Sequence, residues 1–251
     1  MMKRGGFGKL CRIAGETVVR YRLIGEGDRI LAALSGGRDS MVMMHLLEHL
    51  RHRAPVKFTV VCATFDPGFP GFRAEAVAEY CRINGWEHRI VRMDIPAILE
   101  EKGFTDSPCV LCSRLRRGKL SGLAKELHCG KLALGQHLDD VISSFFMSLC
   151  RGQGLSSMAP LVRPAAADAP TVIRPLALVP RQLIRECTAE LGVPEGIGKC
   201  TYEEQLKTGD RAVFEALVED LARRIPDVRS NIARSLTHLE PDHLLLPPED
   251  E

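Results

Sequence analysis

The residues that determine the architecture of this chain read Ser35-Gly36-Gly37-Arg38-Asp39-Ser40. They follow a short apolar run at 30–34 and precede an apolar-periodic run at 41–50. This order predicts a strand, a tight glycine turn and a helix. Adjacent glycines let the backbone approach a ligand closely, and the N-terminus of a helix offers unpaired N–H groups to an anion such as pyrophosphate.

The polar residues of this turn suit a nucleotide. The hydroxyls of Ser35 and Ser40 can donate hydrogen bonds to phosphate oxygens. Asp39 would repel bare phosphate, so its presence predicts a bridging Mg²⁺ ion. The turn lacks the G-x-x-x-x-G-K-[ST] pattern of the Walker loop. The alternative is a glycine turn that binds nothing, but the coincidence of the six residues with a strand-to-helix context favours a phosphate site.

Short apolar runs alternate with helical patterns along the rest of the chain. We expect strands at 30–34, 58–63, 88–91, 131–134 and 172–176. We expect helices at 12–23, 39–52, 71–84, 112–128 and 139–150, followed by C-terminal helices at 180–191, 209–223 and 226–240. This alternation predicts an α/β fold with a doubly wound, mainly parallel sheet and C-terminal helices. Such sheets bind ligands beyond the carboxyl ends of their strands.

The composition of the 251 residues, 45% hydrophobic and 26% charged, is that of an ordinary globular protein. We expect four segments, which are a basic N-terminal extension (1–26), a nucleotide-binding domain with an inserted C-x-x-C (27–180), a helical region carrying Cys200 (181–240) and an acidic tail (241–251). No apolar run approaches the roughly 20 residues of a membrane helix, and we see no signal peptide. We therefore expect no membrane association and a cytoplasmic location.

Positive charge is concentrated locally, although the net charge is only +2. One basic segment covers residues 3–22, and a second consists of Arg114, Arg116, Arg117 and Lys119. Two separate basic patches suit a nucleic-acid backbone better than a small substrate. A solvated surface is the alternative on charge alone.

The nine cysteines are an odd number, which argues against a disulfide scaffold. Cys109 and Cys112 form a C-x-x-C at the start of a predicted helix, where the helix N-terminus and nearby arginines lower thiol pKa values. Cys200, in a glycine-containing loop, is a third candidate ligand. Three thiolates favour a [4Fe–4S] cluster with one open iron over tetrahedral zinc, which takes four ligands. A redox pair and a zinc site remain as alternatives.

A second strand-to-helix turn is predicted at Gly135-Gln136-His137-Leu138-Asp139-Asp140. It follows the apolar run 131–134 and lies on the same edge of the predicted sheet as the first turn. His137 can hold a phosphate or the adenosine, and Asp139 or Asp140 can hold Mg²⁺. The alternative is that the two acids only favour a helix N-terminus.

In this order, the segments resemble those of the tRNA 2-thiocytidine synthetases, a branch of the PP-loop ATP pyrophosphatases with an adenine nucleotide alpha hydrolase-like fold. The likeness covers residues 21–239. The matching pieces are 35–40, 66–70, 109–118, 133–140, 145–147 and 172–176. The most specific piece is the C-x-x-C continued as Ser113-Arg114-Leu115-Arg116-Arg117-Gly118, which other PP-loop enzymes such as lysidine synthetases lack.

This resemblance implies an ATP-dependent tRNA thiolase, a sulfurtransferase. ATP would adenylate the C2 carbonyl oxygen of a tRNA base, most commonly an anticodon-loop cytidine. Sulfur from a cysteine desulfurase or another donor would then displace AMP and give 2-thiocytidine. The family holds a [4Fe–4S] cluster on three cysteines, which here would be Cys109, Cys112 and Cys200. With Asp39, these cysteines are the implied catalytic residues.

The resemblance also assigns binding roles. The implied ATP-binding residues are Ala33, Ser35, Gly36, Gly37, Asp39, Ser40, Gly135, His137 and Asp140. Asp39 and Asp140 would hold Mg²⁺, and Arg114, Arg116, Arg117 and Lys119 would bind tRNA. For the oligomeric state we expect a homodimer, the commonest arrangement.

Five positions depart from the family pattern, and they leave the acceptor base open. They are Arg38 for Lys, Gln136 for His, Ser143 and Ser144 for Glu-Thr, and Glu203 for a further Cys. One alternative is therefore a PP-loop paralogue that adenylates or thiolates another nucleotide or a small molecule. Another is a nucleotide-binding metal or redox sensor without turnover.

Overall fold

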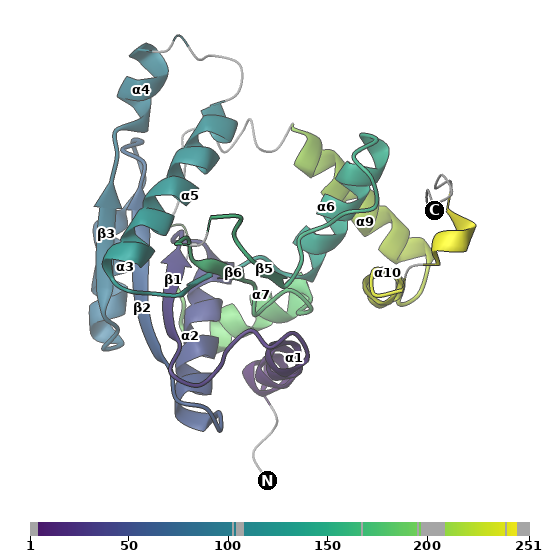
Figure 1. Cartoon of the computed structure of the whole chain (residues 1–251), viewed down its shortest axis with the longest axis horizontal. Helices are drawn as coiled ribbons and strands as arrows, with labels where there is room; N and C mark the ends of the chain where they lie inside the picture. Colours follow the sequence, from purple (N-terminus) through teal and green to yellow (C-terminus); the bar gives the residue numbers. More distant parts are fainter. Residues whose placement is uncertain are drawn as a thin grey trace.

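A computed structural model describes residues 5–101, 103, 108–166, 168–194, 196, 209–238 and 240–244. It forms one sheet with helices on both faces (Figure 1). The strands are β1 (Arg29–Leu34), β2 (Thr59–Asp66), β3 (His88–Arg92), β4 (Lys131–Ala133), β5 (Leu161–Val162) and β6 (Thr171–Ile173). The helices are α1 (Gly6–Arg20), α2 (Arg38–Arg53), α3 (Ala74–Ile83), α4 (Ile95–Glu101), α5 (Pro108–Glu126), α6 (Leu138–Cys150), α7 (Arg181–Glu190), α9 (Asp210–Arg224), α10 (Val228–Ser235) and a 3₁₀ turn, η1 (Pro241–His243).

The sheet has the strand order β3-β2-β1-β4-β6-β5. All pairs are parallel except β5 with β6. The chain builds outward from β1 to β3 and then crosses back to place β4 on the other side of β1. The carboxyl ends of β1 and β4 therefore flank a topological switch point, where doubly wound sheets bind ligands. The predicted fold class is confirmed.

The two faces of the sheet carry separate cores because successive strand residues point to opposite sides. Ile30 and Ala32 of β1 pack into a cluster with residues of α1, α2 and α7. Leu31 packs into a second cluster with residues of α4 and α5. Near-continuous apolar strands are what a doubly covered parallel sheet requires.

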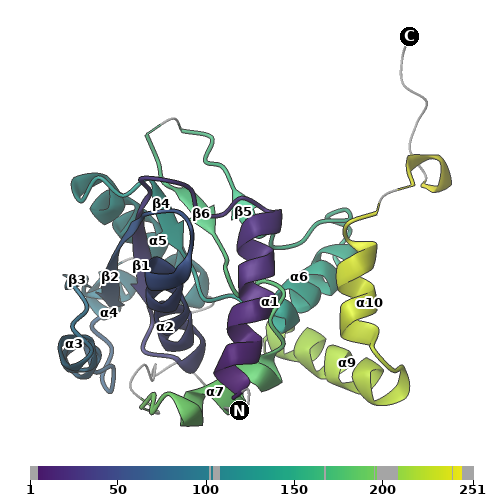
Figure 2. The same ribbon diagram turned by 90° about the horizontal axis from the view of Figure 1, so that it is seen from below.

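The segment predicted as a basic N-terminal extension is part of the main core. Leu10 and Ala14 of α1 are fully buried, and the N–H of Phe7 donates to Glu190 of α7 at 2.9 Å. Figure 2 shows α1 lying beside α7. The basic residues of α1 occupy its other faces. The predicted segment boundaries themselves stay a prediction.

Two short elements were not expected from the sequence. Helix α4 follows β3, and β5 lies within 160–170, a segment in which we predicted neither a strand nor a helix. Each is too short for a reliable periodic pattern, and β5 exists only through its pairing with β6. None of the helices in the described ranges combines the length and the apolar content needed to cross a bilayer.

A third, smaller core lies beside the sheet, among α6, α9 and α10. Leu138 and Ile142 of α6 pack there against Val218 of α9. In Figure 1 these three helices form a group to one side of the strands. This arrangement places α9 and α10, which come late in the chain, against the start of α6 and therefore against the second predicted turn.

Candidate ATP and thiolation site

The first turn, between β1 and α2, is held by its own polar groups. The N–H of Ser35 donates to the hydroxyl of Ser40 at 3.1 Å, and that hydroxyl donates to the carbonyl of Gly37 at 2.8 Å. Gly36 has a φ of 74°, which favours glycine. These short-range bonds fix the loop before any ligand arrives, and they leave Asp39 with a side chain that is 46% exposed.

The second turn, between β4 and α6, is packed against the first. A Cβ added to Gly135 would lie 2.9 Å from the N atom of Ser40 and 3.0 Å from its Cα. Only glycine therefore fits where the two turns cross. Two positions further on, His137 has a side chain only 2% exposed and lies with its Nε2 atom 3.9 Å from Asp39 Oδ2. The two predicted turns form one site.

The two acids of the second turn are buried and bound to arginines from distant helices. Asp139 accepts the backbone N–H of Arg181 at 2.9 Å and the Nε–H of Arg229 at 2.8 Å. Asp140 accepts the N–H of His137 at 3.0 Å and pairs with Arg211. Asp139 is thus held by the protein itself, whereas Asp140 faces the site.

Sequence reasoning did not identify Arg181, Arg211 or Arg229 as partners of these two acids. They come from α7, α9 and α10, between 42 and 90 positions after the acids that they contact. Arginine is common on helix surfaces, so nothing in their local sequence marks them. The only usable signal was the adjacent pair Asp139 and Asp140, because carboxylates that become buried require cations somewhere in the fold.

The electrostatics separate the acids. Burial raises the pKa of Asp39, and although His137 opposes this, the nearby charge of Asp140 adds to the rise. Burial would also raise the pKa of Asp139, but the N–H of Arg181 and the guanidinium of Arg229 hold it below its ordinary value. Asp39 and Asp140 both line the adjoining cavity, and carboxylate oxygens are the ligands that Mg²⁺ prefers, so these two residues fit the expected ion.

A cavity of about 440 Å³ opens beside the two turns. Its lining includes eight residues predicted for the site: Ala33, Ser35, Asp39, Ser40, Gly135, Asp140, Arg116 and Arg117. Phe65, Phe72 and Met158 add apolar surface. Arg174 also lines it and donates from Nε to Gln136 at 3.0 Å. The cavity therefore combines a polar rim, where we expect the phosphates, with an apolar wall suitable for a base.

The C-x-x-C lies at the start of α5, the helix that supplies one wall of this cavity. Cys112 is 7% exposed and Cys109 is half-buried, and neither forms a disulfide. Arg116, one turn further on, lies with Nη2 at 4.0 Å from the Cys112 Sγ and with its guanidinium over the ring of Phe65. Cys200, the predicted third ligand, lies outside the described residues, and so does Glu203.

The basic residues of α5 divide into two sets. Arg116 and Arg117 line the cavity, whereas Arg114 and Lys119 are exposed and lie outside its lining. Gly36 and Gly37 shape the first turn without lining the cavity either. Within the described ranges, no group of three or more His, Cys, Asp or Glu side chains is arranged to hold a metal ion.

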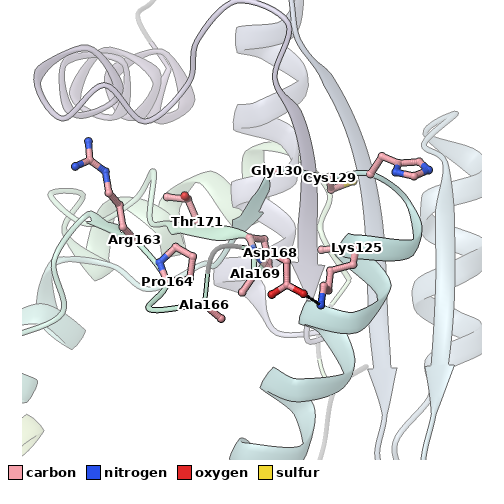
Figure 3. Close-up of a pocket in the computed structure, with 12 residues that line it drawn as sticks. Lys125, Cys129, Gly130, Arg163, Pro164, Ala166, Asp168, Ala169 and Thr171 are labelled. Carbon is pink, nitrogen blue, oxygen red and sulfur yellow. Dashed lines mark hydrogen bonds and ion pairs between the residues drawn. The ribbon is translucent and has the colours of Figure 1, made fainter.

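A larger hollow of about 580 Å³ lies at the opposite, amino end of β4 and β6 (Figure 3). Gly130 and Thr171, at the starts of these strands, line it, and Lys125 and Asp168 form an ion pair across its edge. It has neither a glycine turn nor a group of converging acids. The glycine turn and the acids that we expect of a nucleotide site lie at the carboxyl end instead.

Comparisons with known proteins agree with this geometry. Residues 16–194 match the PP-loop domain family. The tRNA-cytidine(32) 2-sulfurtransferase of Syntrophotalea carbinolica is 37% identical over 240 residues, covering 95% of this chain and 92% of the relative. That of Geobacter sulfurreducens is 38% identical over 240 residues, covering 94% and 92%.

Among solved structures, the U34-tRNA thiolase NcsA from Methanococcus maripaludis with its [4Fe-4S] cluster superposes with a TM-score of 0.75 at 22% identity. The match covers 96% of this chain and 84% of that one, and it supports the fold. The predicted resemblance is confirmed, and the chain belongs to the tRNA 2-thiocytidine synthetases of the PP-loop family.

Proposed function

We propose that this protein is an ATP-dependent tRNA sulfurtransferase that converts a cytidine of tRNA to 2-thiocytidine. The name of its relatives specifies cytidine 32, and we assign the same base to this chain. The proposal includes ATP with Mg²⁺ and a [4Fe–4S] cluster as cofactors. A cytoplasmic location, a cysteine desulfurase as sulfur donor and a homodimer stay predictions from the sequence.

One observation carries the proposal: a single cavity joins the phosphate-binding turn to the helix that begins with the C-x-x-C. Ser35 and Asp39 line one side, and Ser113 and Arg116 line the other. Ser113 directly follows Cys112 in the chain. A base held in the cavity would therefore be within reach of both an activating nucleotide and a sulfur-bearing centre, which is the proximity that a two-step substitution requires.

The chain's residues divide the work of adenylation. The N–H groups at the start of α2 and the hydroxyl of Ser35 bind phosphate oxygens, and Arg116 and Arg117 add positive charge at the cavity wall. The C2 oxygen of the base attacks the α-phosphorus, and the bond to the β-phosphate oxygen breaks with its electron pair leaving on pyrophosphate. The oxygen, formerly a poor leaving group, can now depart as part of AMP.

Cys109 and Cys112 fit a cluster. They lie three positions apart on one helical turn, where both thiols reach the same side of the helix end. The helix N-terminus and Arg116, whose Nη2 atom lies 4.0 Å from the Cys112 Sγ, place positive charge beside them, which suits thiolate ligands. When bound, the cluster supplies an open iron that can present sulfide to the activated carbon. Cys200 is the proposed third ligand from the sequence.

The two basic sets of α5 suggest how tRNA is held. Arg114 and Lys119 are exposed and suit backbone phosphates, which bind through charge and not through sequence. Arg116 and Arg117 instead reach the inserted base or the nucleotide. Substitution of Arg114 should therefore weaken tRNA binding and its salt dependence, whereas substitution of Arg117 should reduce turnover.

Anaerobic purification with iron and sulfide analysis tests the cluster. We expect about four irons per chain, lost in Cys109→Ser and Cys200→Ser and retained in Cys150→Ser, because Cys150 is an exposed residue outside the proposed ligand set. Stoichiometric zinc in place of iron would refute the cluster.

Mass spectrometry of tRNA nucleosides tests the substrate. A deletion strain should lack 2-thiocytidine and regain it with the wild-type gene but not with Asp39→Asn. An unchanged nucleoside profile in the deletion strain would reject tRNA thiolation and favour a paralogue that acts on another substrate.

A further inference from the structure

A second, smaller cavity of about 190 Å³ adjoins the site and is lined by four arginines. They are Arg38, Arg181, Arg185 and Arg211. Asp39, Asp140 and Arg211 line both this cavity and the 440 Å³ cavity, so the two adjoin at these residues. Guanidinium groups from three elements around one small polar space favour a multiply charged phosphate group.

Arg211 is the member of this group that occupies the expected metal position. Its Nη2 atom pairs with Oδ1 of Asp140, while the other oxygen, Oδ2, accepts the N–H of His137. Both oxygens of Asp140 are therefore engaged. A Mg²⁺ ion that used Asp140 would have to take Oδ1 from Arg211, because Mg²⁺ requires close oxygen ligands in octahedral geometry.

Both residues would keep a partner of opposite charge in such an exchange. The side chain of Asp140 is 5% exposed, so it requires a cation, whether guanidinium or metal. Arg211 is 54% exposed and has a second acceptor one turn away, because its Nε donates to Glu215 at 3.1 Å. On leaving Asp140, it would keep this anchor and still line the arginine-rich cavity.

The neighbouring aspartate provides a built-in contrast. Asp139 is also buried and bound to an arginine, Arg229, but neither residue lines either cavity. The same Asp–Arg chemistry is thus present twice at the start of α6, once as a support and once at the ligand site. Arg211 also lies beyond residues 16–194, the part that matches the PP-loop domain.

We propose that Arg211 and the divalent cation compete for Asp140, and that the displaced guanidinium binds the β- and γ-phosphates in the small cavity. Arg211 would then neutralise the charge that develops on the leaving pyrophosphate. This inference rests on the proposed use of ATP. Arg211, on a C-terminal helix, would thus leave the carboxylate of Asp140 and bind the nucleotide phosphates when the metal ion and ATP enter the site.

The first test is Mn²⁺ binding to the anaerobically purified full chain without nucleotide, followed by electron paramagnetic resonance of the unbound ion. Mn²⁺ prefers the same oxygen ligands as Mg²⁺. Arg211→Ala should bind Mn²⁺ about tenfold more tightly than the wild type, because a competitor is removed. Arg211→Lys should fall between the two. Unchanged or weaker Mn²⁺ binding in Arg211→Ala would overturn the competition.

The second test is inhibition of ATP turnover by pyrophosphate. Arg211→Ala should require about tenfold more pyrophosphate for the same inhibition. Arg229→Ala is the matched control, since it removes the guanidinium from Asp139; it should lower thermal stability but leave both Mn²⁺ and pyrophosphate affinity unchanged. Equal shifts in both variants would indicate a merely structural role and overturn the inference.

The two tests also separate this inference from the function on which it rests. A wild-type protein that releases pyrophosphate from ATP, combined with an Arg211→Ala variant of unchanged Mn²⁺ affinity, would reject the role of Arg211 alone. Tighter Mn²⁺ binding in Arg211→Ala, combined with no ATP turnover in the wild type, would support the competition for Asp140 and reject the proposed ATP chemistry.

Discussion

The two strand-to-helix turns of this protein connect the same kinds of element, but different contacts hold them. The β1–α2 turn is closed by bonds among residues no more than five positions apart, such as Ser35 to Ser40. The β4–α6 turn is closed by arginines at least 42 positions away, which bind Asp139 and Asp140. The first turn is held by local bonds, whereas the second has the local bond from His137 to Asp140 and is also held by arginines of helices that come later in the chain.

This difference teaches how one site combines stability and activity. Asp39 of the first turn is nearly half exposed and electrostatically disfavoured, while Asp139 of the second is buried and stabilised. A positively charged ligand would stabilise the ionised form of Asp39. It would add little to Asp139, whose charge Arg229 already neutralises. Substitutions in the two turns should therefore affect activity and stability in opposite proportions.

The contact between the two turns should be the most sensitive point. In Gly135→Ala, the added Cβ would lie within 3.1 Å of backbone atoms of Asp39 and Ser40. We expect a loss of about 1–3 kcal/mol in the free energy of unfolding. Pyrophosphate release should fall about 100-fold, because the turns would move apart. Denaturant titration and a pyrophosphate assay measure the two effects.

Gly130→Ala is the control for that prediction, because a Cβ at Gly130 meets no atom within 4 Å. It lies just before β4, at the other end of the same strand. Equal losses of stability and activity in both variants would contradict the idea that Gly135 is needed for the close approach of the two turns.

Removing the charge of Asp139 should mainly cost stability. We expect Asp139→Asn to lower the free energy of unfolding at pH 7 by about 2–3 kcal/mol, because Arg229 loses its buried partner. Asp220→Asn, which weakens exposed ion pairs to Arg223 and Arg224, should cost less than about 1 kcal/mol. Similar losses in the two variants would contradict the structural role of Asp139.

The same residue gives a pH dependence. The folded-state pKa of Asp139 lies below its ordinary value of 3.8, so its stabilisation is present above that pH and is lost as the pH falls through the folded-state pKa. Acid unfolding of the wild type should therefore be steeper below about pH 4 than that of Asp139→Asn. Parallel curves from denaturant titrations between pH 3 and pH 6 would contradict this assignment.

Removing the charge of Asp39 should mainly cost activity. We expect Asp39→Asn to reduce pyrophosphate release about 100-fold, because a metal-binding carboxylate is lost. The raised pKa of Asp39 means that its ionised form opposes folding at neutral pH, so the free energy of unfolding should stay level or rise slightly. A large loss of stability without a loss of activity would reverse the contrast with Asp139.

The smallest effect is expected within the first turn itself. Ser40→Ala removes the acceptor for the Ser35 N–H and the donor to the Gly37 carbonyl. We expect a loss of about 1 kcal/mol in the free energy of unfolding. Ser230→Ala, which removes one exposed bond to the carbonyl of Asp227, should cost less. Equal costs would indicate that the hydroxyl network does not hold the turn.

Much of the fold and part of the geometry of the candidate site could be predicted from the sequence. The alternation of apolar runs and helical patterns predicted the doubly wound sheet. Residues 35–40 predicted the turn between β1 and α2, because its glycines and hydroxyls act over a few positions. The helix opened by Cys109 was predicted for the same reason. Short elements such as α4 and β5 were missed, since a few residues carry no measurable period.

The glycine turns, the C-x-x-C helix and the family could be predicted from the sequence alone, because each depends on residues that are close together in the chain. Only the packing of α7, α9 and α10 brought Arg181, Arg211 and Arg229 to the second turn. The sequence around an arginine does not indicate which aspartate of another helix it will contact. The separation of Asp39 from Asp139 in burial and pKa also required the assembled fold, since solvent exclusion and counter-charges come from residues far away in the chain.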